Sequence, residues 1–191
     1  MLAQKTDTLA QASNSWLKSY YLVRFAVSAV WVALAFTVAQ TMPPLAAIML
    51  VAYPAWDALA NFVDARRTGG MSRNKSQLLN FVISVLATLA VAVALTNSMN
   101  AVLAVYGVWA VLSGLFQLIT AVRRWKTSGA QWAMILSGAQ SALAGAFFLK
   151  QANEPKVPSM ADIAPYAAFG AFYFLVSALW LMVSDFRRRE R

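Results

Sequence analysis

The stretch AVLAVYGVWAVLSGLFQLITAVRR, residues Ala101–Arg124, decides the fold of this chain. It joins an apolar run to an arginine doublet, and a run of about 20 apolar residues is what a helix needs to cross a hydrocarbon layer about 30 Å thick. Inside hydrocarbon the backbone must satisfy its own hydrogen bonds, so the run predicts a helix rather than a strand. Similar runs predict six membrane spans, approximately at residues 19–39, 44–65, 78–95, 101–122, 131–149 and 165–186.

The basic residues are sorted by loop, and this sorting predicts the orientation of the chain. Three arginine doublets, at Arg66-Arg67, Arg123-Arg124 and Arg187-Arg188, each close an apolar run. Of the 16 basic residues, all but Lys150 and Lys156 fall on one side, which the positive-inside rule assigns to the cytoplasm. Both termini are then cytoplasmic. We expect a cytoplasmic or interfacial segment at 1–18, a membrane domain at 19–187 and a basic tail at 188–191.

The doublets also suggest an internal repeat. Each one ends a unit of two spans, and an even number of spans makes successive units enter the membrane in the same direction. Parallel repeats of this kind are related by an axis along the membrane normal. The predicted fold is therefore an all-α polytopic membrane protein, with three parallel repeated hairpins in a pseudo-threefold bundle. The alternative, that any three apolar hairpins ending in arginines look alike, stays open.

Composition excludes several kinds of chemistry. The chain has 60% hydrophobic residues, 12% charged residues, no cysteine and no histidine. It lacks the usual general base, the commonest metal ligand and any thiolate. We therefore predict no catalytic residue, no metal site and no cofactor. The net charge of +9 is explained by topology and by the lipid bilayer as partner, not by nucleic acid. The basic loops could also bind anionic lipid headgroups, although a purely topological role is the plainer interpretation.

Polar residues within the spans form the candidate site, and most fall in the cytoplasmic halves. Asp57 is the one carboxylate deep in a span, about 12 Å from its inner end at 1.5 Å per residue. We predict that Asp57 pairs with Arg24, because an unpaired charge at this depth would be costly. Pro54, three residues before Asp57, has no N–H and leaves the carbonyl of Leu50 without its helical donor. The site is either responsive to protons or a ligand, or it only fixes helix register. Its members are Arg24, Asp57, Asn61, Asn80 and Gln117.

Small residues at four-residue spacing occupy the fifth span, as the pairs Gly138/Ala142 and Ser141/Gly145. Such spacing permits close approach of two helices in a membrane. We expect this face to pack within the bundle rather than form a dimer interface.

The segment Tyr106–Leu149 resembles the HdeD-like acid-resistance membrane protein family, a short-repeat membrane domain of unknown function. The stretch Tyr53–Arg67 is similar to members of the same group, and Asp57 and Ala178 depart from the repeat where the fourth span has Gly114. The resemblance implies a bacterial inner-membrane protein linked to survival of acid stress, without established catalytic residues. It rests on Ser113-Gly114, Arg123-Arg124, Trp132, Ser137-Gly138 and Gly145.

Two functions follow from these observations. The first is a non-enzymatic inner-membrane protein of the acid-stress family that acts structurally or through a partner, either a second copy or another membrane protein. The alternative is a small proton-coupled transporter or permease with a cytoplasm-facing polar site around Asp57 and Arg24. An intramembrane enzyme is disfavoured, since the chain lacks histidine, cysteine and a clustered carboxylate pair.

Overall fold

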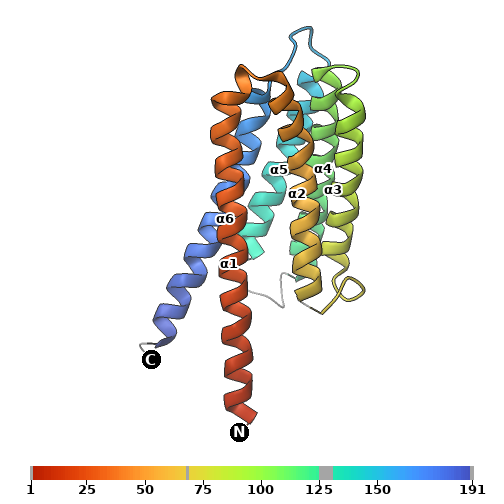
Figure 1. Cartoon of the computed structure of the whole chain (residues 1–191). Helices are drawn as coiled ribbons and strands as arrows, with labels where there is room; N and C mark the ends of the chain where they lie inside the picture. The colour runs from red at the N-terminus through yellow and green to blue at the C-terminus, as the bar shows by residue number, and fades with distance from the viewer. Residues whose placement is uncertain (1, 68, 125–130, 190–191) are drawn as a thin grey trace. The chain divides into compact units, whose positions relative to one another are not determined.

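In the computed structural model, all of the regular secondary structure within the described part of the chain is helical (Figure 1). That part comprises residues 2–67, 69–124 and 131–189, without the side chains of residues 2–14, 120–121, 123–124, 131–134 and 188–189. The arginines of the second doublet and Arg188 of the third therefore lie outside the described side chains, as does most of the predicted interfacial segment. The helices are α1 (Leu2–Phe36), η1 (Val38–Gln40, a 3₁₀ turn), α2 (Pro43–Arg67), α3 (Lys75–Ala94), α4 (Met99–Arg124), α5 (Gln131–Gln151) and α6 (Met160–Arg189).

The helices coincide with the predicted spans, and the chain is a multi-pass membrane protein. Helices α2 to α5 begin and end within three residues of the predicted boundaries. By length and composition, five segments can cross a membrane: Ser15–Phe36, Pro43–Arg67, Lys75–Ala94, Met99–Ile119 and Met160–Arg187. The crossing by α5, a helix of 21 residues, stays a prediction.

Two helices extend beyond the predicted boundaries. Helix α1 runs without a break from Leu2 to Phe36, so the polar lead continues the first span. Helix α6 begins at Met160, before the predicted start at Pro165. The reason is a cap: the Asp162 carboxylate accepts hydrogen bonds from the backbone N–H of Ser159, at 2.7 Å, and from its hydroxyl, at 2.9 Å. This arrangement is half of a capping box and sets the first turn of a helix.

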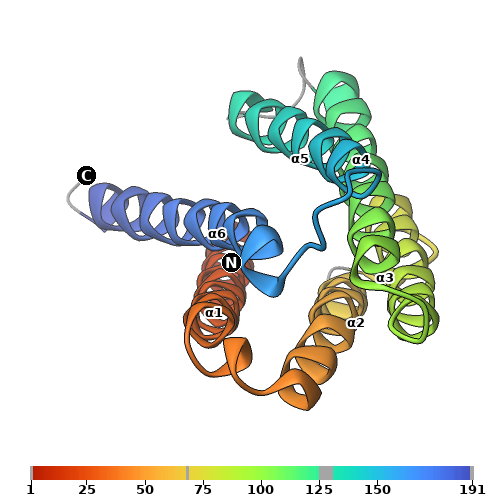
Figure 2. The same cartoon turned by 90° about the horizontal axis from the view of Figure 1, so that it is seen from above.

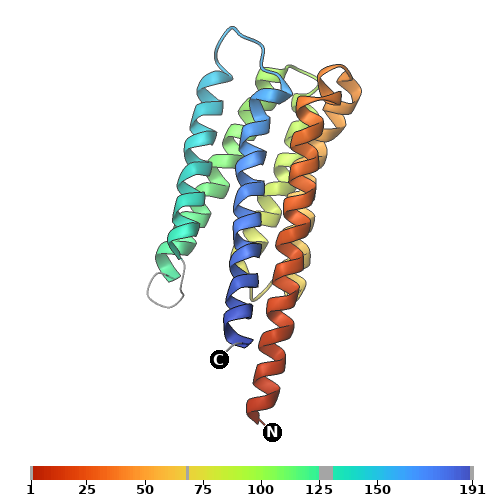
Figure 3. The ribbon, with the colours of Figure 1, turned by 90° about the vertical axis from the view of Figure 1, so that its left-hand side faces the viewer.

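The chain divides into two compact units, each described by itself. The first comprises residues 1–33 and 167–191. Within it, Tyr21 stacks on Phe174 with 6.3 Å between ring centroids, and the Lys18 ammonium lies 2.7 Å from the Asp185 carboxylate. These contacts pair the later part of α1 with α6 in antiparallel fashion, as Figure 3 shows.

The second unit comprises residues 34–166 and contains all of the predicted site residues except Arg24. Seen from above in Figure 2, helices α2, α3, α4 and α5 follow one another in chain order, each against the next. Helix α2 therefore packs on α3 and α4 packs on α5, although the sequence prediction assigns the members of each pair to different hairpins. The three-hairpin, pseudo-threefold arrangement stays a prediction.

Four glycines bring α4 and α5 together. A Cβ placed on Gly107 would lie 2.9 Å from the carbonyl oxygen of Gly145, and one on Gly114 would lie 2.5 Å from that of Gly138. On each helix the two glycines are seven residues apart, so they lie on the same face, two turns from each other. The prediction that Gly138 and Gly145 pack within the chain is confirmed.

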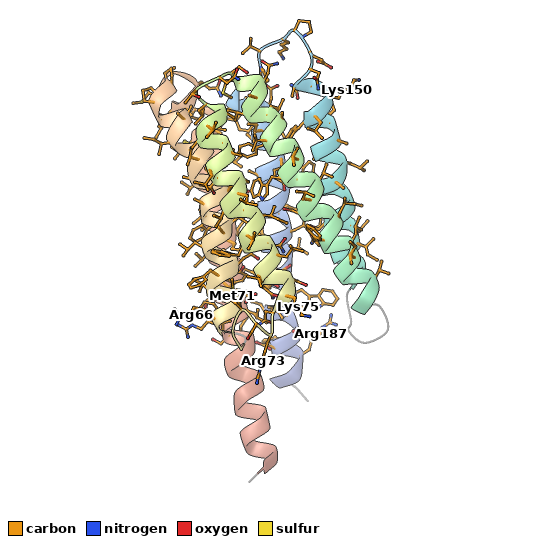
Figure 4. All side chains as sticks on the ribbon, turned by 90° about the vertical axis from the view of Figure 1, so that its right-hand side faces the viewer. Arg66, Met71, Arg73, Lys75, Lys150 and Arg187 are labelled. Atoms are coloured by element: carbon orange, nitrogen blue, oxygen red, sulfur yellow. The ribbon has the colours of Figure 1, made fainter. Side chains whose placement is uncertain are left out.

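Charge separates the two ends of the second unit. Arg66, Arg73 and Lys75 lie at the end where α2 meets α3, and Lys150 lies at the opposite end (Figure 4). The turn at the basic end contains Gly69 and Gly70, whose φ angles of 109° and 92° lie in the region that favours glycine. This distribution agrees with the predicted sorting of charge, while the cytoplasmic location of that end stays a prediction.

Candidate functional site

The centre of the candidate site is the carboxylate of Asp57, which links α2 to α3. The hydroxyl of Ser84 on α3 donates to Asp57 Oδ2 at 2.8 Å. The side-chain amide of Asn61, one turn further along α2, donates to the same oxygen at 3.0 Å and to the Asp57 backbone carbonyl at 2.8 Å. Asp57 is half-buried, while Ser84 and Asn61 are buried. One carboxylate oxygen thus has two neutral donors from two helices.

A tryptophan extends this network to α4. The indole Nε1–H of Trp109 donates to the Ser84 hydroxyl oxygen at 3.1 Å, so Ser84 accepts from one helix and donates to another. Trp109 is 5% exposed, and its ring makes edge contacts with Tyr53, Tyr106 and Tyr166. Edge-to-face contacts of this type stabilise aromatic pairs by about 0.5–1.5 kcal/mol beyond area burial. We call Asp57, Asn61, Ser84 and Trp109 the Asp57 network.

A second bond between α2 and α4 lies beside the network. Pro54 sits inside α2 and has no N–H, so the carbonyl of Leu50 lacks its donor four residues on. The hydroxyl of Tyr106 on α4 donates to that carbonyl at 2.7 Å, and both residues are fully buried. Because a buried polar group without a partner costs free energy, this bond compensates for the proline.

The predicted site residues divide into three groups. Asp57 and Asn61 come together as the i, i+4 spacing on α2 predicts. Asn80 on α3 and Gln117 on α4 are half-buried, and in the described part of the chain no hydrogen bond joins either of them to Asp57. Arg24 belongs to the other unit, where its guanidinium lies 4.2 Å from the ring centroid of Phe174 and donates to the Tyr20 hydroxyl at 3.1 Å. The Arg24–Asp57 pair, which joins two units described separately, stays a prediction.

Sequence reasoning passed over three members of the arrangement. Ser84 lies one turn beyond Asn80 on α3, in a span that also contains Thr88. Trp109 and Tyr106 lie within the apolar run that predicts the fourth span. A signal was present, because a buried tryptophan or tyrosine usually finds a partner for its polar atom. A span that contains both residues, one helical turn from each other, therefore predicts polar contacts between helices, as a span with serines does.

The described contacts of the site are hydrogen bonds. Within the described residues, no three Asp, Glu, His or Cys side chains come close enough to hold a metal ion. The Ser84 hydroxyl and the Asn61 amide, both neutral donors, orient the Asp57 carboxylate. The bonds run from Trp109 through Ser84 to Asp57, and they cross three helices. Such an arrangement fixes the rotation and depth of each helix relative to the next.

Part of the chain matches a known protein family. Residues 79–150 match the family model described as a short repeat of unknown function (DUF308), a family associated with HdeD-like membrane proteins. The matched region begins in α3 and ends in α5, so it includes the four packing glycines and Ser84, Tyr106 and Trp109, but not Asp57. No curated protein and no solved structure matches the chain.

Proposed function

We propose that this chain is a non-enzymatic inner-membrane protein of the HdeD-like acid-stress group, and that it acts structurally or through a partner. The family match to residues 79–150 supports the assignment to this group. The observation that carries the mode of action is the Asp57 network. Its carboxylate is engaged by donors from its own helix and from α3, as expected of a contact that fixes helix packing.

A rigid scaffold suits this role better than a moving one. The α4–α5 contact leaves no space for a Cβ at Gly114 or Gly138, and Tyr106 ties α4 to α2 at the level of Pro54. Packed elements of this kind change arrangement only between discrete states. We propose that residues 34–166 form one stable body that presents its surfaces to lipid and to a partner.

The test compares survival of acid with the amount of folded protein in the membrane. Bacteria lacking the gene are complemented with the wild-type chain, with Asp57→Asn or with Ser84→Ala, and survival after an acid pulse is measured together with the amount of folded protein. For a structural role, survival follows the amount of folded protein, and both variants lower the melting temperature. Unchanged survival on loss of the gene would contradict the acid-stress assignment.

The same variants distinguish the transporter hypothesis. For a proton-coupled transporter, Asp57→Asn would abolish proton flux into proteoliposomes while folding and insertion stay intact, whereas Ser84→Ala would retain most of the flux. For a structural protein, the wild-type chain and both variants give the proton leak of empty liposomes. Flux that depends on Asp57 would therefore overturn the structural role.

A further inference from the structure

An apolar groove of about 370 Å³ lies on the surface of the second unit between α2 and α3. Its rim is open, since Leu59 is 52% exposed and Leu89 is 61% exposed. The lining is almost wholly apolar and includes two phenylalanine rings, whose centroids are 5.7 Å apart. Three of its residues on α2 are Ala55, Leu59 and Phe62, and three on α3 are Phe81, Val85 and Leu89.

The groove continues into the basic turn along one face of α2. Ala55, Leu59, Phe62 and Arg66 are spaced i, i+4, i+7 and i+11, which places them on the same side of a helix. The guanidinium of Arg66 lies 5.6 Å from the ring centroid of Phe62, so a cation stands at the end of the groove. Arg66 is exposed, which leaves its N–H groups accessible.

The turn between α2 and α3 holds further charge near Arg66. Arg73 and Lys75 are exposed and lie at the same end of the unit (Figure 4). The turn is tied down, because the backbone N–H of Gly70 donates to the carbonyl of Ala65 at 2.8 Å. The nearest acidic residue along α2, Asp64, accepts a hydrogen bond from Gln77 at 3.2 Å. An anion at this turn would meet three cationic side chains, those of Arg66, Arg73 and Lys75, and the carboxylate of Asp64.

We propose that this groove and turn form a binding site for one anionic phospholipid. The phosphate of the headgroup binds Arg66 and Arg73, and one acyl chain lies along the groove between Phe62 and Leu89. Two properties select this ligand: the positive turn favours an anionic headgroup over a zwitterionic one, and the apolar floor takes a hydrocarbon chain. The length of α2 from Ala55 to Phe62 is about 10 Å at 1.5 Å per residue, which suits part of one acyl chain in one leaflet.

The test measures lipid retained on the full-length protein by native mass spectrometry. The protein is equilibrated with equal amounts of phosphatidylglycerol and phosphatidylcholine that carry the same acyl chains. We expect one phosphatidylglycerol to be retained in preference, and Arg66→Gln to weaken its retention about fivefold. Lys150→Gln, which removes an exposed charge at the opposite end of the same unit, should retain the lipid as the wild type does. Equal retention of both lipids, or an equal loss in Lys150→Gln, would overturn the proposal.

Two further variants test whether the groove holds an acyl chain. Val85→Trp fills the groove and leaves every charge in place, so it should reduce retention of phosphatidylglycerol, and Leu89→Trp tests the same groove at a more exposed position. If both variants keep full retention and glycerol phosphate alone displaces the lipid, only the headgroup is bound and the acyl site does not exist. If the groove variants instead remove a dimer mass, a second copy of the chain occupies the groove and the proposal is wrong.

Discussion

Gly114 on α4 faces Gly138 on α5 so closely that a Cβ on Gly114 would lie 2.5 Å from the Gly138 carbonyl oxygen. Gly107 and Gly145 repeat the relationship seven residues away on each helix. In a membrane the lipid tails are as apolar as the side chains, so helices associate through packing rather than through the hydrophobic effect. We therefore expect these two close contacts to be important for the stability of the second unit.

The first prediction concerns this contact. Gly114→Ala should lower the free energy of unfolding by about 1–3 kcal/mol, because backbone must move to accept the methyl group. Thermal unfolding in detergent measures the effect. Ala146→Leu is the matched control, since it adds more bulk to α5 at an exposed position. An equal loss in both variants would mean that the α4–α5 pair is sensitive to bulk on any face, and not specifically at the glycines.

The second prediction concerns Pro54 and Tyr106. Tyr106→Phe should destabilise the protein by about 1–2 kcal/mol, because it leaves the buried carbonyl of Leu50 without a donor. In a Pro54→Ala background the N–H of residue 54 can donate to that carbonyl, so the same change should cost less. A double-mutant cycle gives the coupling between the two sites. Strictly additive effects would contradict the compensation that we infer.

A third prediction addresses the Asp57 network. Ser84→Ala removes a donor from Asp57 and an acceptor from Trp109 at once, and should cost about 1–3 kcal/mol. The emission of a tryptophan that loses its indole hydrogen bond should also shift. Ser113→Ala, at a half-buried serine on α4, is the control and should change neither quantity. If Ser84→Ala left the stability unaltered, the Asp57 network would not stabilise the packing of α2, α3 and α4.

The fourth prediction uses the absence of cysteine from the chain. Single cysteines at Ser72 and Asn153, both exposed, report the two ends of the second unit. In intact cells an impermeant thiol reagent should label Asn153→Cys at once and label Ser72→Cys only after the membrane is opened. The reverse pattern would place the basic turn outside and refute the orientation drawn from the positive-inside rule.

The positions of the helices could be predicted from sequence because hydrocarbon imposes a length and forbids unpaired backbone groups. Local bonds were equally accessible: the i, i+4 pair of Asp57 and Asn61 follows from helix geometry alone. The partners on other helices could not be found in this way. The periodicity of α3 gives Asn80 and Ser84 the same face, and only the depth at which α3 packs on α2 selects Ser84.

Helix pairing was the other feature beyond reach of the sequence. The arginine doublets group the spans into consecutive hairpins, but loop connections only require that successive helices be near each other. Two neighbouring helices pack most closely where small residues on one helix lie opposite small residues on the other. The sequence alone does not single out Gly107, because its packing role depends on its position opposite Gly145.

The bond between Tyr106 and Leu50 also has a consequence for how the protein is made. The two residues are 56 positions apart in the chain, so α2 leaves the ribosome well before its missing donor has been synthesised. At the usual rate of about 5–20 residues per second, the interval is roughly 3–11 seconds. During that time the carbonyl of Leu50 lacks the Tyr106 donor, and hydrocarbon supplies no other. The carbonyl of Leu50 therefore gains its buried partner only when α4 arrives, so this contact between α2 and α4 forms late in synthesis.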